Sequence, residues 1–285
     1  MENSITSDGF FEELEELPNK AVVVGAGYIA VELAGILQAL GTDDTSLVLR
    51  KERVLRTFDV MLAETSEEEM QRQEGIQIYR QTNRVEKIVN HYGLKILYLR
   101  NGDIIEGVDT ALVATGRVPL VAPLNLAAIG VQQTEAGHIV TNEYSETSVN
   151  GVYAIGDVCG KVELTHMAIA SGRRLADRLF GPPKWKDAKV LYDNVPTVIF
   201  SHPPIGTIWL TKKEEAIVKY GEQNIKIYRS TFSNMFYGPW QVEVTMFPWE
   251  LSNQTSGAVH SPFNGATAAA SPDNVDSSSW EKSKK

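Results

Sequence analysis

Short apolar runs alternate with amphipathic stretches over the first 80 residues of the chain. Residues 21–24 and 47–49 are continuous apolar runs, typical of strands buried on both faces, and residues 76–79 are a third predicted strand. Residues 29–40 repeat apolar side chains at helical spacing, and residues 59–73 form a second amphipathic stretch. Strands and helices that alternate in this way predict an α/β fold with a parallel sheet.

The period of the pattern changes to two after Asn83. Residues 85–89 and 94–99 read as strands, and residues 101–103 have the composition of a turn. This predicts an antiparallel meander attached to the parallel sheet. Residues 109–116 then return to a buried strand that ends at a glycine.

Both ends of the chain differ from the rest. Residues 1–18 are acidic and weakly patterned, which predicts a solvated lead-in. After about Ser252 the composition is dominated by Ser, Thr, Ala, Gly, Asn and Pro. Such a composition cannot bury enough apolar surface to offset chain entropy, so we expect residues 244–285 to be disordered.

Composition and charge narrow the function. The chain is 43% hydrophobic and carries a net charge of -9, so we expect no nucleic-acid partner, and an anionic ligand requires a local basic cluster. No apolar run is long enough to span a bilayer, and the first residues do not resemble a secretory signal, so we expect no membrane association. The single cysteine, Cys159, cannot form an intrachain disulfide and is interpreted as a packing residue. We expect no metal site and a cytoplasmic or mitochondrial location.

A glycine-rich turn follows the first predicted strand. Residues 25–30 form the pattern Gly-x-Gly-x-x-Ala between a buried strand and an amphipathic helix. Gly25 permits the tight turn, Gly27 lets the backbone approach a pyrophosphate, and Ala30 lets helix and strand pack closely. The start of the helix presents free N–H groups to the anion. Because strand, turn and helix stand in this order, the turn predicts a dinucleotide site.

The end of the second predicted strand decides between cofactors. An NAD enzyme usually carries an acid there for the ribose 2′-hydroxyl. Here Arg50 and Lys51 follow the strand, with Arg53 and Arg56 close behind, and guanidinium groups match a phosphate bidentately. We therefore predict recognition of a 2′-phosphate, and so NADP(H), by Arg50, Lys51 and Arg56. Glu52 keeps NAD as an alternative.

The combined motifs resemble the FAD-dependent pyridine nucleotide–disulfide oxidoreductases, and among them the glutathione reductases. Besides the Arg50 and Arg56 pair, the resemblance rests on GAGYIAVE at 25–32, ATGRVP at 114–119, GVYAIGDV at 151–158 and NVPTVIFSHPPIGT at 194–207. It implies a Rossmann-like NADP(H)-binding domain at 19–118, the second half of an FAD-binding domain at 119–181, and a truncated α+β interface domain at 182–243.

The resemblance also implies roles for individual residues. Tyr28 would cover the nicotinamide pocket, Asp157 would bind the FAD ribityl chain, and Thr165 would contact the flavin. Glu163 and Val198 would lie near the nicotinamide. The remaining cofactor residues would line the NADPH site: Gly25, Ala26, Gly27, Ile29, Ala30, Glu32, Arg50, Lys51, Arg56, Gly116 and Arg117.

Two parts of the family pattern are not found. The first FAD glycine motif and the Cys-x4-Cys redox disulfide precede the matching region in the family, and Glu32 there pairs with a lysine near that disulfide. The His-Pro motif that supplies acid and base is not found either, and His260 lies in the tail. We therefore assign no catalytic residue and expect weak FAD binding.

Several functions stay open on the sequence. The intact family members are homodimers that pass hydride from NADPH to FAD and electrons through a disulfide to glutathione disulfide. The chain by itself is expected to be catalytically incomplete. The alternatives are a non-catalytic NADP(H)-binding fragment, or another member of the family such as a thioredoxin reductase or a dihydrolipoamide dehydrogenase.

Overall fold

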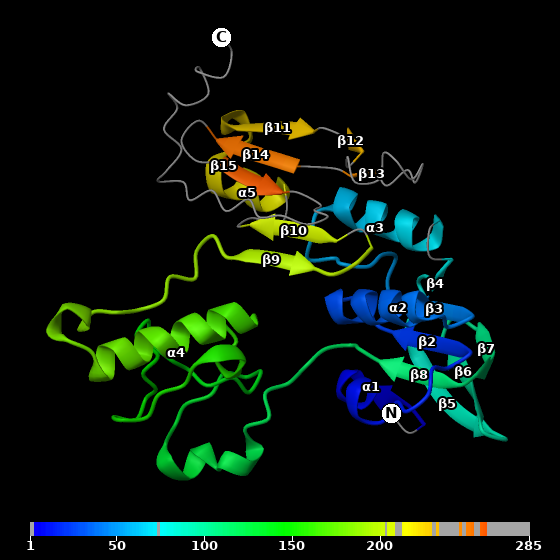
Figure 1. The fold of residues 1–285 in the computed structure, drawn as a ribbon, viewed down its shortest axis with the longest axis horizontal. Coiled ribbons are helices and arrows are strands. Elements are labelled where there is room, and N and C mark those ends of the chain that lie inside the picture. Colours follow the sequence, from blue (N-terminus) through cyan, green and yellow to red (C-terminus); the bar gives the residue numbers. More distant parts are fainter. Residues whose placement is uncertain are drawn as a thin grey trace. The chain divides into compact units, whose positions relative to one another are not determined.

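The computed structural model divides the chain into two compact units. It describes residues 3–72, 75–202, 204–208 and 213–229, and four short strand segments beyond them. One unit comprises Met1–Gly116 with Pro196–Lys285, and the other comprises Arg117–Val195 (Figure 1).

A five-stranded parallel sheet is the frame of the first unit. Its strand order is β1-β8-β2-β3-β4, and every neighbouring pair is parallel. The strands are β1 (Ile5–Thr6), β2 (Lys20–Val24), β3 (Asp44–Val48), β4 (Gln77–Tyr79) and β8 (Thr110–Val113). The helices α2 (Tyr28–Leu40) and α3 (Val60–Arg72) connect them as crossovers, so the predicted α/β fold class is confirmed.

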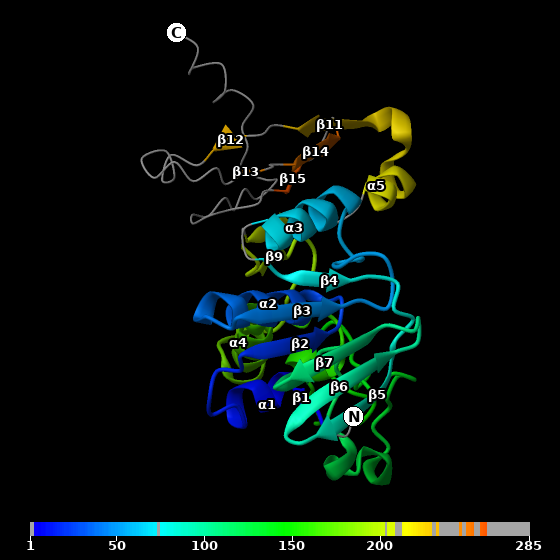
Figure 2. The same cartoon turned by 90° about the vertical axis from the view of Figure 1, so that its right-hand side faces the viewer.

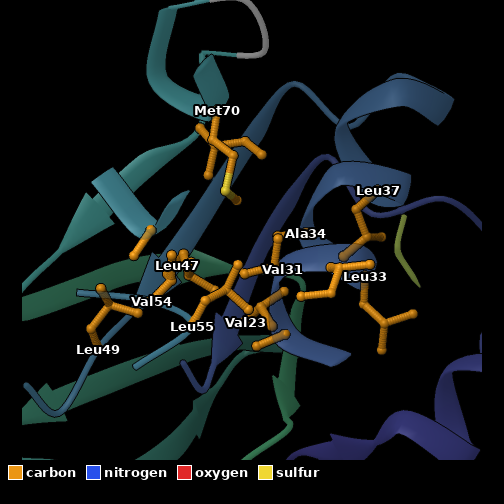
Figure 3. Close-up of a cluster of buried hydrophobic side chains, with 14 of the residues drawn as sticks. Val23, Val31, Leu33, Ala34, Leu37, Leu47, Leu49, Val54, Leu55 and Met70 are labelled. Carbon is orange, nitrogen blue, oxygen red and sulfur yellow. The ribbon is translucent and has the colours of Figure 1, made fainter. Parts of the chain in front are cut away.

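Alternate residues of β2 and β3 serve two separate cores. Val23 and Leu47 pack with side chains of α2 and α3, as the close-up in Figure 3 shows. Val22 and Val48 face the other way and pack against the meander. Both strands are therefore buried on both faces, which explains their continuous apolar sequence.

The meander is an antiparallel sheet of three strands in the order β5-β6-β7 (Figure 2). It comprises β5 (Val85–His91), β6 (Leu94–Leu99) and β7 (Ile104–Val108). Its buried side chains, among them Ile88, Leu97 and Ile105, close the second core. The predicted change of period after Asn83 is thus confirmed.

The acidic lead-in was predicted wrongly. Ile5–Thr6 forms β1 and pairs with Leu112 and Val113 of β8, and α1 (Ser7–Glu12) follows. Ile5, Phe10 and Leu14 pack against the first core, whereas the glutamates from Glu12 to Glu16 stay exposed. The pattern was overlooked because these apolar residues are widely spaced among acids.

The C-terminal part of the first unit adds a hairpin, a helix and further strands. The hairpin pairs β9 (Pro196–Ile199) with β10 (Ile205–Ile208), and its Ile199 and Ile205 are buried in the first core. The stretch expected as one domain at 182–243 is therefore divided at Val195, because these two side chains belong to the core of the first unit. Also described are α5 (Lys213–Tyr220), η5 (Glu222–Asn224) and β11 (Ile225–Arg229).

Part of the tail expected to be disordered forms strands. β14 (Trp249–Asn253) and β15 (Gly257–His260) extend a three-stranded antiparallel sheet from β11, and β13 (Thr245–Met246) pairs with β12 (Phe232–Ser233). The alternation of apolar and polar residues in 249–253 is a strand pattern, which a composition averaged over the tail conceals. The rest of the tail lies outside the described residues.

The second unit contains one long helix and several short 3₁₀ turns. They are η1 (Ala122–Leu124), η2 (Leu126–Ile129), η3 (Gly156–Cys159), α4 (Thr165–Phe180) and η4 (Pro183–Trp185). Its small core is formed by Val121, Leu126, Val131, Ile139 and Ala154. Within the described part of the whole chain, no helix is both long and apolar enough to cross a membrane.

Arg178 of α4 ties the second unit together. Its Nη1 donates to Glu146 Oε1 at 2.9 Å, and its guanidinium lies over the rings of Tyr144 and Tyr153 at 5.3 and 5.7 Å. Hydrogen bonds from Asn142 and from Arg178 lower the pKa of Glu146 below its ordinary value of 4.5.

The core supplies a first prediction. Leu47 is fully buried and Leu40 is 65% exposed. We expect Leu47→Ala to lower the free energy of unfolding by about 2–5 kcal/mol, because it removes buried surface and leaves a cavity. Leu40→Ala should change it by less than about 0.5 kcal/mol. Chemical denaturation followed by circular dichroism measures both, and equal losses would contradict the assigned core.

Glu146 supplies a prediction on pH. A carboxyl with a lowered folded-state pKa stabilises the protein above its ordinary pKa, and that contribution is lost as pH falls through the folded value. Glu146→Gln should therefore make stability less dependent on pH between about pH 6 and pH 3. Urea denaturation at several pH values measures the dependence, with the exposed Glu135→Gln as control. A profile identical to that of the unmodified chain would refute the role of Glu146.

Candidate nucleotide-binding site

The glycine turn between β2 and α2 is closely packed at its first position. Gly25 donates to the Val48 carbonyl oxygen at 3.1 Å. A Cβ built on Gly25 would lie 2.3 Å from the carbonyl oxygen of Ala114 and 2.9 Å from the Cβ of Ala30. No side chain fits there, so Gly25 and the small Ala30 together let β2, β8 and α2 approach closely.

The third residue of the turn is open. A Cβ built on Gly27 meets no atom within 4 Å, and Gly27 is the N-cap of α2 without a side chain that could cap the helix. The first turn of any helix has amides without intrahelical partners and the positive end of the helix dipole. The space at Gly27 therefore suits an anionic group such as a pyrophosphate.

Three cations border the site at the end of β3. Arg50, Lys51 and Arg56 are exposed, and no carboxylate of the described residues forms an ion pair with them. Arg53 differs, because its guanidinium contacts Glu52 at 3.1 Å and Glu64 at 3.5 Å. The uncompensated positive charge thus belongs to the three residues that the sequence singled out for a phosphate.

Two cavities lie beside these cations and share Arg50 and Arg56 as lining residues. The larger has a volume of about 860 Å³ and is lined by residues of the basic stretch, including Arg50, Lys51 and Arg56. The smaller, of about 300 Å³, is lined by Gly25 and Ala26 of the turn and again by Arg50 and Arg56. Arg50 and Arg56 thus line both the cavity of the basic stretch and the cavity of the glycine turn, and each cavity has a size typical for ligands.

Sequence reasoning missed the segment after β4. Gln81 and Asn83 line the larger cavity, and Thr82 and Arg84 line the smaller one. The Gln81 amide donates to the Lys51 carbonyl at 2.8 Å, which places this segment beside the basic stretch. Its position after a parallel strand was the available signal, because ligands bind at the carboxyl ends of such strands.

The remaining predicted residues of the first unit lie at separate places. Tyr28 begins α2 and is 44% exposed, while Ile29 is half-buried beside it. Glu32, also on α2, accepts a hydrogen bond from the Phe200 amide at 2.8 Å. Val198 is exposed on β9, and Gly116 follows β8 at the end of this part of the unit.

Four predicted residues lie in the second unit. Arg117 is its first residue, Asp157 is exposed in η3, and Thr165 begins α4. Glu163 faces His138, with a distance of 3.6 Å between Oε1 and Nε2.

Cys159 ends η3 and is half-buried. Burial raises the pKa of its thiol, and a hydrogen bond involving Thr141 and the charge of Lys161 offset this in part. The thiol is therefore protonated at neutral pH, which agrees with a packing role. No cluster of three potential metal ligands occurs among the described residues.

Comparisons with known proteins identify the family of the chain. The profile of the family described as pyridine nucleotide-disulphide oxidoreductase matches residues 3–172. The chain is 43% identical over 239 residues to glutathione reductase of Yarrowia lipolytica. The aligned region covers 83% of this chain and 50% of that relative. It therefore spans about half the length of the curated relative it matches.

Solved structures support the fold. The HOCl-induced flavoprotein disulfide reductase RclA from Escherichia coli matches with a TM-score of 0.78 and 22% identity, over 92% of this chain and 58% of that one. Its Cu(II) complex matches with a TM-score of 0.77 and 23% identity, over 92% and 57%. With the family profile matching residues 3–172, the chain belongs to the pyridine nucleotide-disulphide oxidoreductase family.

Proposed function

We propose that this chain contains the NADPH-binding part of a glutathione-disulfide reductase. One observation carries the proposal: Arg50 and Arg56, which form no ion pair with any carboxylate of the described residues, line the cavity that also contains Gly25 and Ala26 of the glycine turn, and Lys51 lines the neighbouring cavity. A 2′-phosphate would neutralise them, and NADH has no group that does so. The 43% identity to a glutathione reductase supports the choice of glutathione disulfide as the substrate of the whole enzyme.

The residues of the first unit would bind and orient the nucleotide. The start of α2 would hold the pyrophosphate at Gly27, and the basic stretch would hold the 2′-phosphate. Tyr28 would cover the nicotinamide, with Val198 near it. Bound FAD would accept hydride from NADPH and pass electrons on to a disulfide.

The second unit would contribute to the flavin site. Asp157 is exposed in η3, where its carboxylate can accept hydrogen bonds from sugar hydroxyls such as those of the ribityl chain. Thr165 at the start of α4 would contact the flavin ring. These two groups alone form a small part of a flavin site, so we propose that FAD binds weakly.

The cysteine content favours a second candidate, a non-catalytic NADP(H)-binding chain. The 285 residues contain one cysteine, so a redox disulfide cannot form within them. We propose that these residues by themselves bind NADP(H) without reducing glutathione disulfide. A thioredoxin reductase or a dihydrolipoamide dehydrogenase is a further alternative, and the latter would favour NADH.

Nucleotide binding tests the proposal directly. We expect the purified chain to bind NADPH more tightly than NADH in calorimetry. Arg56→Gln should raise the Kd for NADPH about tenfold or more, the effect of one lost hydrogen bond to a charged group, and leave that for NADH nearly unchanged. Arg53→Gln is the control, because Arg53 is already paired with Glu52 and Glu64. Equal affinity for both nucleotides would refute the proposal, and so would the absence of binding of either one.

Turnover tests the catalytic part. We expect the chain with added FAD and NADPH to show no oxidation of NADPH by glutathione disulfide above a control without enzyme, because the dithiol step has no second sulfur. Absorbance at about 340 nm, where the reduced nicotinamide absorbs and the oxidised form does not, follows the reaction. Turnover that depends on glutathione disulfide would show that another electron path exists.

A further inference from the structure

A buried glutamate on α3 forms hydrogen bonds with the backbone that carries the cations after β3. Glu67 is 6% exposed, and its Oε1 accepts the Val54 amide at 2.7 Å. Its Oε2 accepts Nε and Nη2 of Arg80 at 3.1 and 2.7 Å. The carboxylate therefore joins α3, the end of β4 and the backbone between Arg53 and Arg56. We call residues 50–56 the basic loop.

The next amide of the basic loop is held as well. Leu55 donates to the Ala26 carbonyl oxygen of the glycine turn at 2.7 Å. Its φ is 47°, a left-handed conformation that is costly for a leucine, and it is 1% exposed. Such a backbone persists only when the surroundings fix it, and Figure 3 shows Val54 and Leu55 among the core side chains. Two consecutive amides are thus held by two fixed oxygens.

We call the carboxylate of Glu67, with its hydrogen bonds to the Val54 amide and to Arg80, the clamp. The negative charge of Glu67 is balanced within it. Arg80 supplies the opposite charge and also bonds Gln71 Oε1 at 3.0 Å. A buried carboxylate with a bidentate partner and a backbone donor is satisfied on both oxygens. Removing either partner would leave a buried group unsatisfied, so the arrangement fixes one geometry of the loop.

We propose that Glu67 is a positioning residue for 2′-phosphate selectivity. This inference rests on the proposed function, because it assumes that Arg50 and Arg56 bind the 2′-phosphate. By holding the Val54 amide, Glu67 sets the backbone from which Arg56 projects toward both cavities. Loosening the loop weakens NADPH binding, whereas NADH makes no contact that needs this geometry.

The test is the affinity ratio of Glu67→Gln. A glutamine of the same shape has one acceptor oxygen, so either Val54 or Arg80 loses its partner. We expect the ratio Kd(NADH)/Kd(NADPH) to fall about tenfold, as for one lost hydrogen bond to a charged group, while the Kd for NADH stays within about twofold. A ratio equal to that of the unmodified chain would overturn the inference.

Glu69→Gln is the matched control. The side chains of Glu69 and Glu67 are each 7% exposed on the same helix, but Glu69 bonds Arg72 of α3 at 2.9 Å. The control should lose stability and keep the ratio. An equal fall of the ratio in both variants would show that general destabilisation, and not the clamp, lowers selectivity.

Hydrogen exchange of the unmodified chain covers the case in which Glu67→Gln does not fold. The Val54 and Leu55 amides should exchange far more slowly than those of Arg50 and Lys51 in the nucleotide-free protein. If the Val54 and Leu55 amides exchanged as fast as those of Arg50 and Lys51, the inference that these two amides are held would be overturned. The two proposals fail separately: an unmodified chain without NADPH preference refutes the function, and a Kd ratio in Glu67→Gln equal to that of the unmodified chain refutes the positioning role.

Discussion

The hydrogen bond from the Leu55 amide to the Ala26 carbonyl joins the two halves of the nucleotide site. Ala26 belongs to the glycine turn after β2, and Leu55 belongs to the loop after β3. The bond is 2.7 Å long and its donor is buried, so little water competes for it. It therefore fixes the distance between the glycine turn and the basic loop, the two elements to which the proposed function assigns the pyrophosphate and the 2′-phosphate.

The parallel sheet makes that bond possible. β2 and β3 run in register from Lys20 opposite Asp44 to Val24 opposite Val48, so both strands end at the same edge. Their alternating burial in two cores leaves no freedom to slip by one residue, since a slip would exchange the two faces. The position of the turn and of the basic loop at one edge is thus a consequence of core packing.

The features predicted from sequence are those with a local pattern. The runs at 21–24 and 47–49 and the glycine spacing depend on neighbouring residues alone, and the structure places each element within a few residues. β1 was missed because its two residues gain their stability from partners in β8, more than 100 positions away. The sequence places Glu67 in an amphipathic stretch but does not distinguish it from the neighbouring acids, since its burial depends on its contact with the basic loop.

The charge at the end of β3 bears on which nucleotide the fold favours. An acid at this point accepts the two ribose hydroxyls of NAD, and would repel a phosphate. Arg50 occupies the position here, and the carboxylate of the nearby Glu52 is paired with Arg53. Converting the site to NADH would therefore require more than the loss of one cation. It would need a carboxylate at the strand end and a loop that no longer holds Arg56 against the turn. The hydrogen bonds of Glu67 to Val54 and Arg80, which we propose to support selectivity for the phosphorylated nucleotide, would oppose that change.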